Sequence, residues 1–195
     1  MNRFSHFIVV AFAALALVLA SAASATTVQK FTLQELTKRA SSIVVGKVDD
    51  AVSSWDAAKK EIYTYYTITV SQPVKGARNG ETITIRQLGG TVGSIASIVP
   101  GMPSFKRDEE VVLFLTQKDA AGYPWVLGLQ QGKYSVVEQD GLKMVRNDLA
   151  GTELLSPNGS RIKPTVSPDQ PLGAFIDGIK TTLDIDGKVQ ATPTE

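Results

Sequence analysis

Alternating apolar and polar residues predict the first pair of strands. In residues 61–70 (EIYTYYTITV) large apolar side chains recur at alternate positions, with Thr64 as the exception, and in residues 81–86 (ETITIR) isoleucine alternates with threonine and arginine. A period of two is typical of strands with one buried face. A glycine-containing turn at residues 75–80 separates the two segments, so we expect them to pair as a hairpin. The pattern places Ile62, Tyr66, Ile68 and Val70 on one face of the first strand and Tyr63, Tyr65, Thr67 and Thr69 on the other.

Continuous apolar runs predict strands that are buried on both faces. Residues 41–48 (SSIVVGKV) and 111–115 (VVLFL) are rich in β-branched and other large apolar side chains, and we expect the second run to be a central strand. Residues 125–129 (WVLGL) offer a further short strand. The segment GKYSVVEQDGLKMVR predicts a hairpin about the dipeptide Asp140-Gly141, which is the strongest hairpin signal in the chain.

Capping residues predict a short helix before the first strand. Thr32 is suited to the N-cap position, and Glu35 three residues later completes a capping box. Phe31 is placed to pack onto Leu36 as a hydrophobic staple. We expect this helix to end near Ala40.

A second amphipathic segment predicts a helix after the last strand. Residues 172–183 (LGAFIDGIKTTL) follow an irregular connection that is rich in proline, glycine, asparagine and serine, residues 147–171. We expect residues 186–195 to form a disordered tail. The apolar stripe of the helix consists of Leu172, Phe175, Ile176, Ile179 and Leu183.

The order of these elements predicts a mainly β fold. Five or six short antiparallel strands and a hairpin lie between an N-terminal and a C-terminal helix. We expect a small OB-like antiparallel β-barrel, because closure of a sheet removes its exposed edges. An open sandwich is the alternative.

The first 25 residues predict a secretory signal peptide. Arg3 is basic, residues 7–19 are apolar, and Ala23-Ser24-Ala25 is a small-residue cleavage site. The apolar run is short for a bilayer span and lacks basic stop-transfer residues. We therefore expect cleavage after Ala25, a single domain over residues 26–185, export to the periplasm or the medium, and no membrane insertion after cleavage.

Composition restricts the chemistry of the predicted mature chain. The whole chain has no cysteine, and its one histidine, His6, leaves with the signal peptide. Triads and dyads that use His or Cys, and ordinary His/Cys zinc sites, are therefore excluded. Loss of Arg3 lowers Lys+Arg from 20 to 19, which equals the 19 Asp+Glu, and a neutral chain does not favour nucleic acid. We expect a non-enzymatic protein without a cofactor or a metal ion.

The stretch RQLGGTVGSIASIVPGMPSF (residues 86–105) is the leading candidate site. It has four glycines and two prolines, but neither GxGxxG nor GK[ST], so it is not a phosphate-binding loop. Loops of this length without regular structure are often functional. Its large apolar side chains either fold back onto the barrel or face a partner. The candidate partner-binding residues are Gly89, Gly90, Ile95, Ile98, Val99, Pro100, Met102 and Phe105, together with the predicted N-terminal residue Thr26.

Two other groups of side chains are weaker candidates. Tyr63 and Tyr65, with Trp55, form either an aromatic stacking platform or the second face of a barrel strand. A carboxylate cluster supports the hypothesis of a hydrolase, because glycosidase-like chemistry needs two carboxylates in distinct environments. The cluster consists of Asp108, Glu109 and Glu110.

The succession of strands between Leu33 and Val137 resembles that of a known group. The segments SSIVVGKV, TYYTITVSQPVKG, ETITIRQLGG, EEVVLFL and GLQQGKYSV, in this order, resemble uncharacterised bacterial secreted proteins. Their outline is similar to the OB-type barrel of tissue inhibitors of metalloproteinases and of netrin-like modules. Those inhibitors place an N-terminal cysteine on the zinc of the protease, whereas the predicted N-terminal residue here is Thr26.

Three hypotheses follow for the function. The first is an exported, non-catalytic binding module that uses the loop from Gly89 to Phe105 and the adjoining barrel rim; its expected partner is an extracytoplasmic protein, for example a secreted protease. The second, implied by the resemblance, is inhibition of a metalloprotease through Thr26 and the same loop. The third is a hydrolase that uses the carboxylate cluster.

Overall fold

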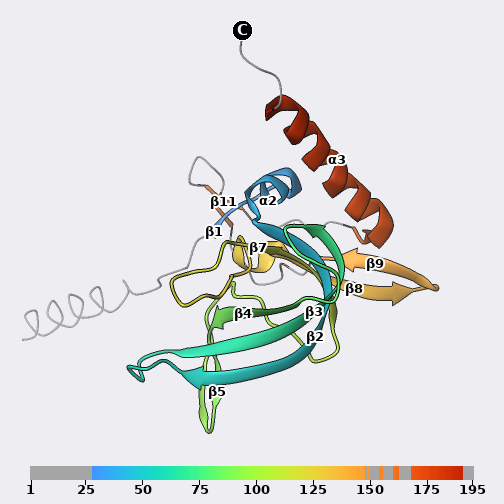
Figure 1. The fold of residues 1–195 in the computed structure, drawn as a ribbon. Helices are drawn as coiled ribbons and strands as arrows, with labels where there is room; N and C mark the ends of the chain where they lie inside the picture. The colour runs from blue at the N-terminus through green and yellow to red at the C-terminus, as the bar shows by residue number, and fades with distance from the viewer. Residues whose placement is uncertain (1–27, 148, 150–153, 156–159, 163–167, 191–195) are drawn as a thin grey trace, which may run out of the picture.

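The computed structural model describes residues 28–147, 149, 154–155, 160–162 and 168–190. The predicted signal peptide and Thr26 lie outside the described residues. The described chain is mainly β, with one large antiparallel sheet and two helices (Figure 1).

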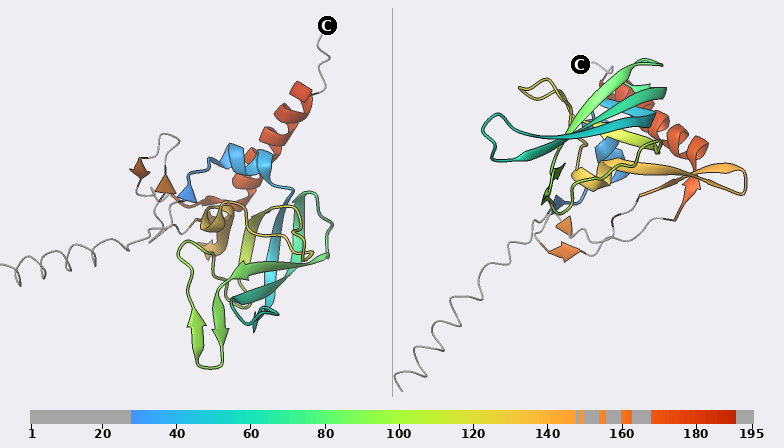
Figure 2. Two further views of the ribbon diagram at one scale, coloured as in Figure 1. Left: turned by 90° about the vertical axis from the view of Figure 1, so that its left-hand side faces the viewer. Right: turned by 90° about the horizontal axis from the view of Figure 1, so that it is seen from below.

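The large sheet has seven strands, and every neighbouring pair in it is antiparallel. From edge to edge, the strands are β12 (Gln170–Pro171), β9 (Leu142–Arg146), β8 (Lys133–Gln139), β7 (Glu110–Leu115), β2 (Ser42–Trp55), β3 (Ile62–Lys75) and β4 (Thr82–Leu88). The remaining strands form two small sheets, one of β5 (Gly90–Val92) and β6 (Ile95–Ser97), the other of β1 (Val28–Gln29), β10 (Leu154–Leu155) and β11 (Arg161–Ile162). Figure 2 shows both from two further directions.

Helix α2 (Leu33–Arg39) confirms the predicted capping box. The Thr32 hydroxyl accepts a hydrogen bond from the Glu35 amide, and the Glu35 carboxylate accepts one from the Thr32 amide. Phe31 packs against the buried cluster that contains Leu36, as the staple requires. The helix ends at the C-cap Ala40, where the chain becomes extended and enters β2.

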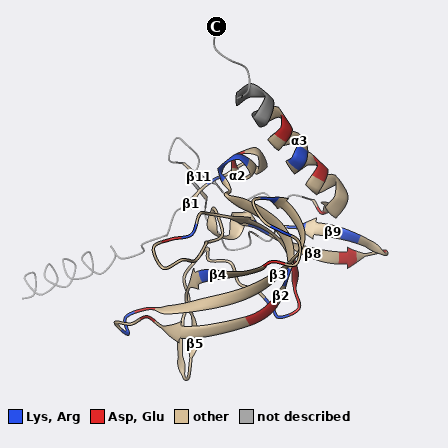
Figure 3. Ribbon diagram, in the orientation of Figure 1, with Lys and Arg blue, Asp and Glu red and all other residues tan. Residues whose placement is uncertain are grey.

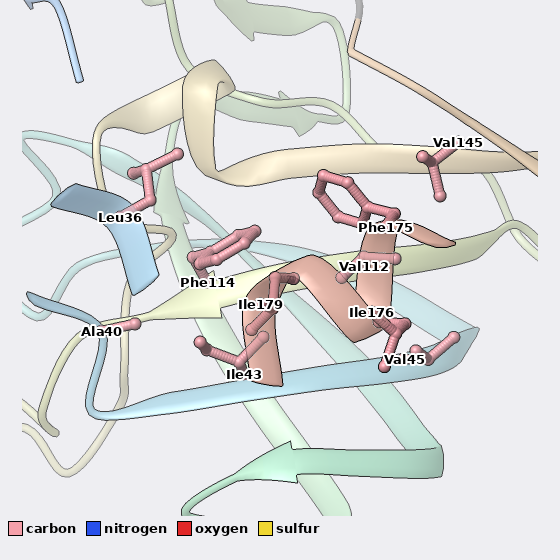
Figure 4. Close-up of a cluster of buried hydrophobic side chains, with 10 residues drawn as sticks. All are labelled: Leu36, Ala40, Ile43, Val45, Val112, Phe114, Val145, Phe175, Ile176 and Ile179. Carbon is pink, nitrogen blue, oxygen red and sulfur yellow. The ribbon is translucent and has the colours of Figure 1, made fainter. Parts of the chain in front are cut away.

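Helix α3 (Leu172–Gln190) covers one face of the large sheet together with α2. Phe175, Ile176 and Ile179 of α3 are at most 2% exposed and pack with residues of β2 and β7 (Figure 4). The predicted apolar stripe is therefore confirmed as the buried side of the helix. The helix continues through residues 186–190, which the sequence assigned to a disordered tail. No helix in the described part of the chain has both the length and the apolar character needed to cross a bilayer.

The opposite face of the sheet has its own apolar cluster. Val44, Ile68, Ile85 and Leu113 are buried in it, and Phe105 packs against it. Strands β2 and β7 contribute to the clusters on both faces, which explains their continuous apolar runs. Register shifts between β2 and β3 bend the strands and increase their twist.

The predicted closed barrel is not found in the described chain. The edge strand β4 reaches the segment 124–127 through one backbone hydrogen bond, from the Arg86 amide to the Pro124 carbonyl (3.2 Å). The predicted strand at residues 125–129 is limited to an isolated bridge between Val126 and Leu115. Gly128 then has a positive φ of 69°, and the 3₁₀ helix η1 (Leu129–Gly132) begins.

Strands β2 and β3 are each 14 residues long, longer than their sequence patterns predict. Their register runs from Ile43 opposite Lys75 to Trp55 opposite Ile62. The outer part of this hairpin extends beyond the helices and supports the candidate site.

Candidate functional site

The loop from Gly89 to Phe105, called here the 89–105 loop, begins with a small hairpin. Strands β5 and β6 pair in register from Gly90 opposite Ser97 to Val92 opposite Ile95, and Gly93 has the positive φ (61°) that the turn requires. The hairpin stands away from the large sheet (Figure 2). Lys, Arg, Asp and Glu are absent from it (Figure 3).

A hydrogen-bond network fixes the base of this hairpin to β2 and β3. The Gly89 amide donates to the Ile62 carbonyl (2.7 Å), and the Thr64 hydroxyl donates to the Gly89 carbonyl (2.7 Å). The hydroxyl oxygens of Ser53 and Thr64 lie 2.8 Å apart and share a hydrogen bond. A Cβ atom at Gly90, whose φ is 137°, would lie 2.2 Å from the Thr64 hydroxyl oxygen. Glycine is therefore required at the point where the loop leaves the sheet.

A cavity of about 190 Å³ lies between the 89–105 loop and the inner face of β3 and β4. Among the residues that line it, Val99 and Met102 come from the loop, Tyr66 from β3, and Gln87 from β4. Gln87 is 2% exposed, and neither polar atom of its side chain has a hydrogen-bond partner among the described residues. Burial raises the pKa of the Tyr66 hydroxyl, so this group stays neutral.

The predicted apolar residues of the loop separate into two groups. The Phe105 ring folds back to 4.6 Å from the Tyr66 ring, and Val99 and Met102 line the cavity. Ile95 is 52% exposed on the hairpin, and Ile98, just after it, is 88% exposed although one side of it reaches the cavity rim. The first group therefore folds back onto the sheet, whereas the second remains exposed. Pro100 lies exposed at the next turn.

The N-terminal segment and the 89–105 loop meet at η1. The Gln131 side chain accepts a hydrogen bond from the Phe31 amide and donates one to the Gln29 carbonyl, each 2.8 Å long. The neighbouring Gln130 amide donates to the Gly101 carbonyl in the loop (3.0 Å). Thr26 lies outside the described residues, but the chain that follows it is held beside the loop.

Each carboxylate of the predicted cluster is paired with a different lysine. The shortest nitrogen to oxygen distances are 2.6 Å for Lys47 and Asp108, 2.8 Å for Lys133 and Glu109, and 2.7 Å for Lys143 and Glu110. The hydrogen bond from Lys47 lowers the pKa of Asp108. Burial raises the pKa of Glu109, but hydrogen bonds from Lys133 and Ser135 outweigh it, and the net shift is downward.

The lowered pKa values of Asp108 and Glu109 do not support either residue as a general acid, because such an acid needs a raised pKa. Within the described ranges, no group of three or more Asp, Glu, His or Cys is placed to hold a metal ion.

Two aromatic residues that flank Arg86 are Tyr63 of β3 and Trp125, not Trp55. The Arg86 guanidinium lies 4.7 Å from the centre of the Tyr63 ring and 5.2 Å from that of Trp125. Its partner is Asp119 (2.5 Å), which also accepts a hydrogen bond from the Trp125 indole (2.7 Å). Arg86 thus holds the segment from Asp119 to Trp125 against the sheet.

The predicted grouping of Trp55 with Tyr63 and Tyr65 is wrong. Trp55 lies opposite Ile62 in the register, and directly opposed residues share a face of the sheet. Tyr63 lies opposite Ser54 and therefore on the other face. The sequence pattern missed this because it did not extend β2 as far as Trp55.

No protein-family model, curated protein or solved structure shows a significant match to this chain.

Proposed function

We propose that this chain is an exported, non-catalytic binding module that contacts a partner protein through the 89–105 loop and the adjoining rim of the sheet. The observation that carries the proposal is the exposure of Ile95 (52%) and Ile98 (88%) on and beside an uncharged hairpin. Clustered, exposed, large apolar side chains are typical of interaction surfaces. Export follows from the predicted signal peptide.

The anchored base of the hairpin supports this function. The hydrogen bonds of Gly89 and Thr64 hold the loop to the sheet before any partner arrives. A surface that is already ordered loses less conformational entropy on binding, so more of the contact energy remains as affinity.

Site-specific crosslinking tests the proposal. A photo-crosslinking residue at position 98 in the expressing cell identifies the partner, and the affinity of the purified partner is then measured by calorimetry. We expect Ile95→Ser with Ile98→Ser to weaken binding at least about tenfold, because burial of an isoleucine side chain stabilises a contact by about 1.5–3 kcal/mol. The control is Leu142→Ser, which removes a side chain that is 60% exposed on β9. Equal loss in both variants, or no loss in the first, contradicts the proposal.

A second candidate is inhibition of a metalloprotease, as the resemblance implies. Its support from the fold is that β3 pairs with β2 and β4, that β7 pairs with β2, and that segment 124–127 contacts β4 and β7 through one hydrogen bond and one isolated bridge. An OB-type barrel would use this order of neighbours. The OB-like assignment is part of this proposal. Its particular support is the contact of both the N-terminal segment and Gly101 with η1, since such an inhibitor uses the N-terminus and a loop together.

The inhibitor function has its own test. Chain that begins at Thr26 is compared with chain that carries one extra N-terminal residue, using a secreted zinc protease and a peptide substrate. Inhibition by the first form only is expected, because the α-amino group of Thr26 itself must reach the zinc, and an extra residue converts it to an amide and moves the free amino group away. Equal inhibition by both forms, or by neither, contradicts it, and neither result affects the crosslinking test.

A further inference from the structure

The side chain of Gln87 is buried without a partner on the wall of a cavity. Gln87 lies opposite Thr64 in the register of β3 and β4, and its side chain is 2% exposed. Its Nε2 donor and its Oε1 acceptor both lack a hydrogen bond from any residue that the structure describes. The neighbouring Thr64 hydroxyl is already engaged with Ser53 and Gly89.

Packing gives no reason for an amide at this position. A buried polar group without a partner loses its hydration and gains nothing in return, so an apolar side chain of similar shape fits such a position at least as well. Among the other described residues that line the cavity, Val99 and Met102 are apolar, and the hydroxyl-bearing ones, such as Tyr66 and Ser97, make no hydrogen bond to the amide. A ligand that satisfies both atoms of Gln87 resolves this conflict.

The lining of the cavity restricts the class of ligand. No Lys, Arg, Asp or Glu lines it, which favours a neutral group. The volume of about 190 Å³ suits one small group and is below the usual range for a drug-sized molecule. Residues at the rim, Ile98 and Ser104, are exposed, so the cavity can be reached from solvent.

The geometry of a carboxamide restricts the class further. The N–H and C=O of Gln87 lie on one edge of its amide plane, so a complementary partner must also present both groups on one edge. A primary carboxamide and a lactam do so. A trans peptide group directs its N–H and C=O to opposite sides and pairs with only one of the two atoms.

We propose that the cavity beneath the 89–105 loop binds a neutral primary carboxamide or lactam, held by paired hydrogen bonds to Gln87 and by apolar contacts to Val99 and Met102. This inference rests on the proposed function, because the same loop forms one wall of the cavity and the partner protein would supply the carboxamide or lactam. Its test uses a small probe and no partner, so the two proposals fail separately.

Two probes of almost equal shape test the pairing. The full chain, isotopically labelled, is titrated with 2-pyrrolidinone and, in parallel, with γ-butyrolactone, which lacks the N–H donor. The amide resonances of Gly89, Gly90 and Val99 report binding. We expect the lactam to bind in about the millimolar range and the lactone to bind roughly tenfold more weakly, since it leaves the Gln87 acceptor unpaired. Equal shifts from both probes, or none from either, overturn the proposal.

Substitution of Gln87 separates a binding role from a structural one. Gln87→Met keeps the length of the side chain and removes both polar atoms. We expect its melting temperature to equal or exceed that of the unaltered protein, and its preference for the lactam over the lactone to disappear. Gln139→Met, at an exposed position of β8, is the control and retains that preference. A lower melting temperature for Gln87→Met together with an unchanged probe preference assigns Gln87 to the fold and overturns the proposal.

Discussion

Substitution of Gly90 by alanine tests whether the base of the 89–105 loop is as tightly fitted as the contacts indicate. The backbone at Gly90 has a φ of 137°, a conformation that only glycine adopts readily. A methyl group there would lie 2.2 Å from the Thr64 hydroxyl oxygen and 2.5 Å from that of Ser53. Gly93, at the turn of the same hairpin, is the matched control, because no atom lies within 4 Å of a Cβ built on it.

The expected cost of Gly90→Ala has two parts. The unfavourable φ costs about 1–3 kcal/mol. Displacement of the Thr64 hydroxyl breaks its hydrogen bonds to Gly89 and Ser53, which adds about 1 kcal/mol for each. The sum is about 3–5 kcal/mol. Gly93→Ala has a φ of 61° and no steric conflict, so we expect a cost of about 1 kcal/mol.

Urea denaturation gives the free energy of unfolding of both variants, and hydrogen exchange at the Gly89 amide reports the loop itself. That amide donates to the Ile62 carbonyl, so its exchange should accelerate in Gly90→Ala and stay unchanged in Gly93→Ala. Equal costs for the two variants, within about 0.5 kcal/mol, would refute the steric argument. A loss of stability without faster exchange at Gly89 would place the damage elsewhere in the sheet.

Three further predictions concern the rest of the fold. The hydrogen bond from Trp125 lowers the pKa of Asp119, so the ionised carboxylate stabilises the fold at pH values above its usual pKa. The stability of the protein should fall as the pH drops through the lowered value. In acid titrations followed by tryptophan fluorescence, Asp119→Asn should remove this pH dependence of stability. Burial raises the pKa of Tyr134 to about 12, so stability should be retained below the unfolded value of 10 and lost as pH rises through about 12, which ultraviolet titration of tyrosine ionisation checks. Phe175→Ala should cost about 3–5 kcal/mol in urea denaturation, whereas Ile185→Ala, at a position that is 56% exposed on the same helix, should change stability by less than about 0.5 kcal/mol.

Local signals in the sequence were sufficient where an element is defined by its own residues. The alternation in residues 61–70, the dipeptide Asp140-Gly141 and the capping box at Thr32 each correspond to the element that they predict. Each of these elements is determined by residues close together in the sequence, so it can be recognised without knowledge of tertiary contacts.

Elements that depend on a partner segment were missed. Residues 49–55 (DDAVSSW) have no apolar alternation, and they are a strand because they pair with β3 as far as Trp55. Residues 125–129 have the apolar pattern of a strand, but Gly128 and Leu129 turn the chain with positive φ values. Closure of the barrel was predicted from the number and order of the strands. It depends instead on the hydrogen bonds between β4 and the segment around residue 124, and the structure has one, from the Arg86 amide to the Pro124 carbonyl.

The sequence located the loop but not its most informative side chain. Glycines and prolines identified residues 89–105, and their apolar residues were named. Gln87, in contrast, follows Ile83 and Ile85 on the same face of β4 by alternation, but its place beneath the loop, beside Val99 and Met102, depends on a contact between separate segments that the local sequence does not show. The segment from Asp119 to Trp125 was missed for the same reason, since its contact with Arg86 joins residues far apart in the chain.

In the 89–105 region an apolar side chain is exposed and a polar side chain is buried, which is the opposite of the arrangement that stabilises a fold. Burial stabilises an aliphatic side chain and costs free energy for an unpaired amide. Yet Ile98 is 88% exposed, while Gln87 is 2% exposed and its amide has no partner among the residues that the structure describes. Elsewhere the two apolar clusters follow the ordinary rule, with Phe114 and Ile68 fully buried. In the 89–105 region both departures from this rule occur within one loop and the cavity beneath it, and hydrogen bonds from Gly89 and Thr64 hold the base of that loop. A ligand would supply the hydrogen bonds that the Gln87 amide lacks, and a partner protein would bury the exposed side chains of Ile95 and Ile98. Because these are separate interactions, the probe titration and the crosslinking experiment test them independently, although both concern the same region.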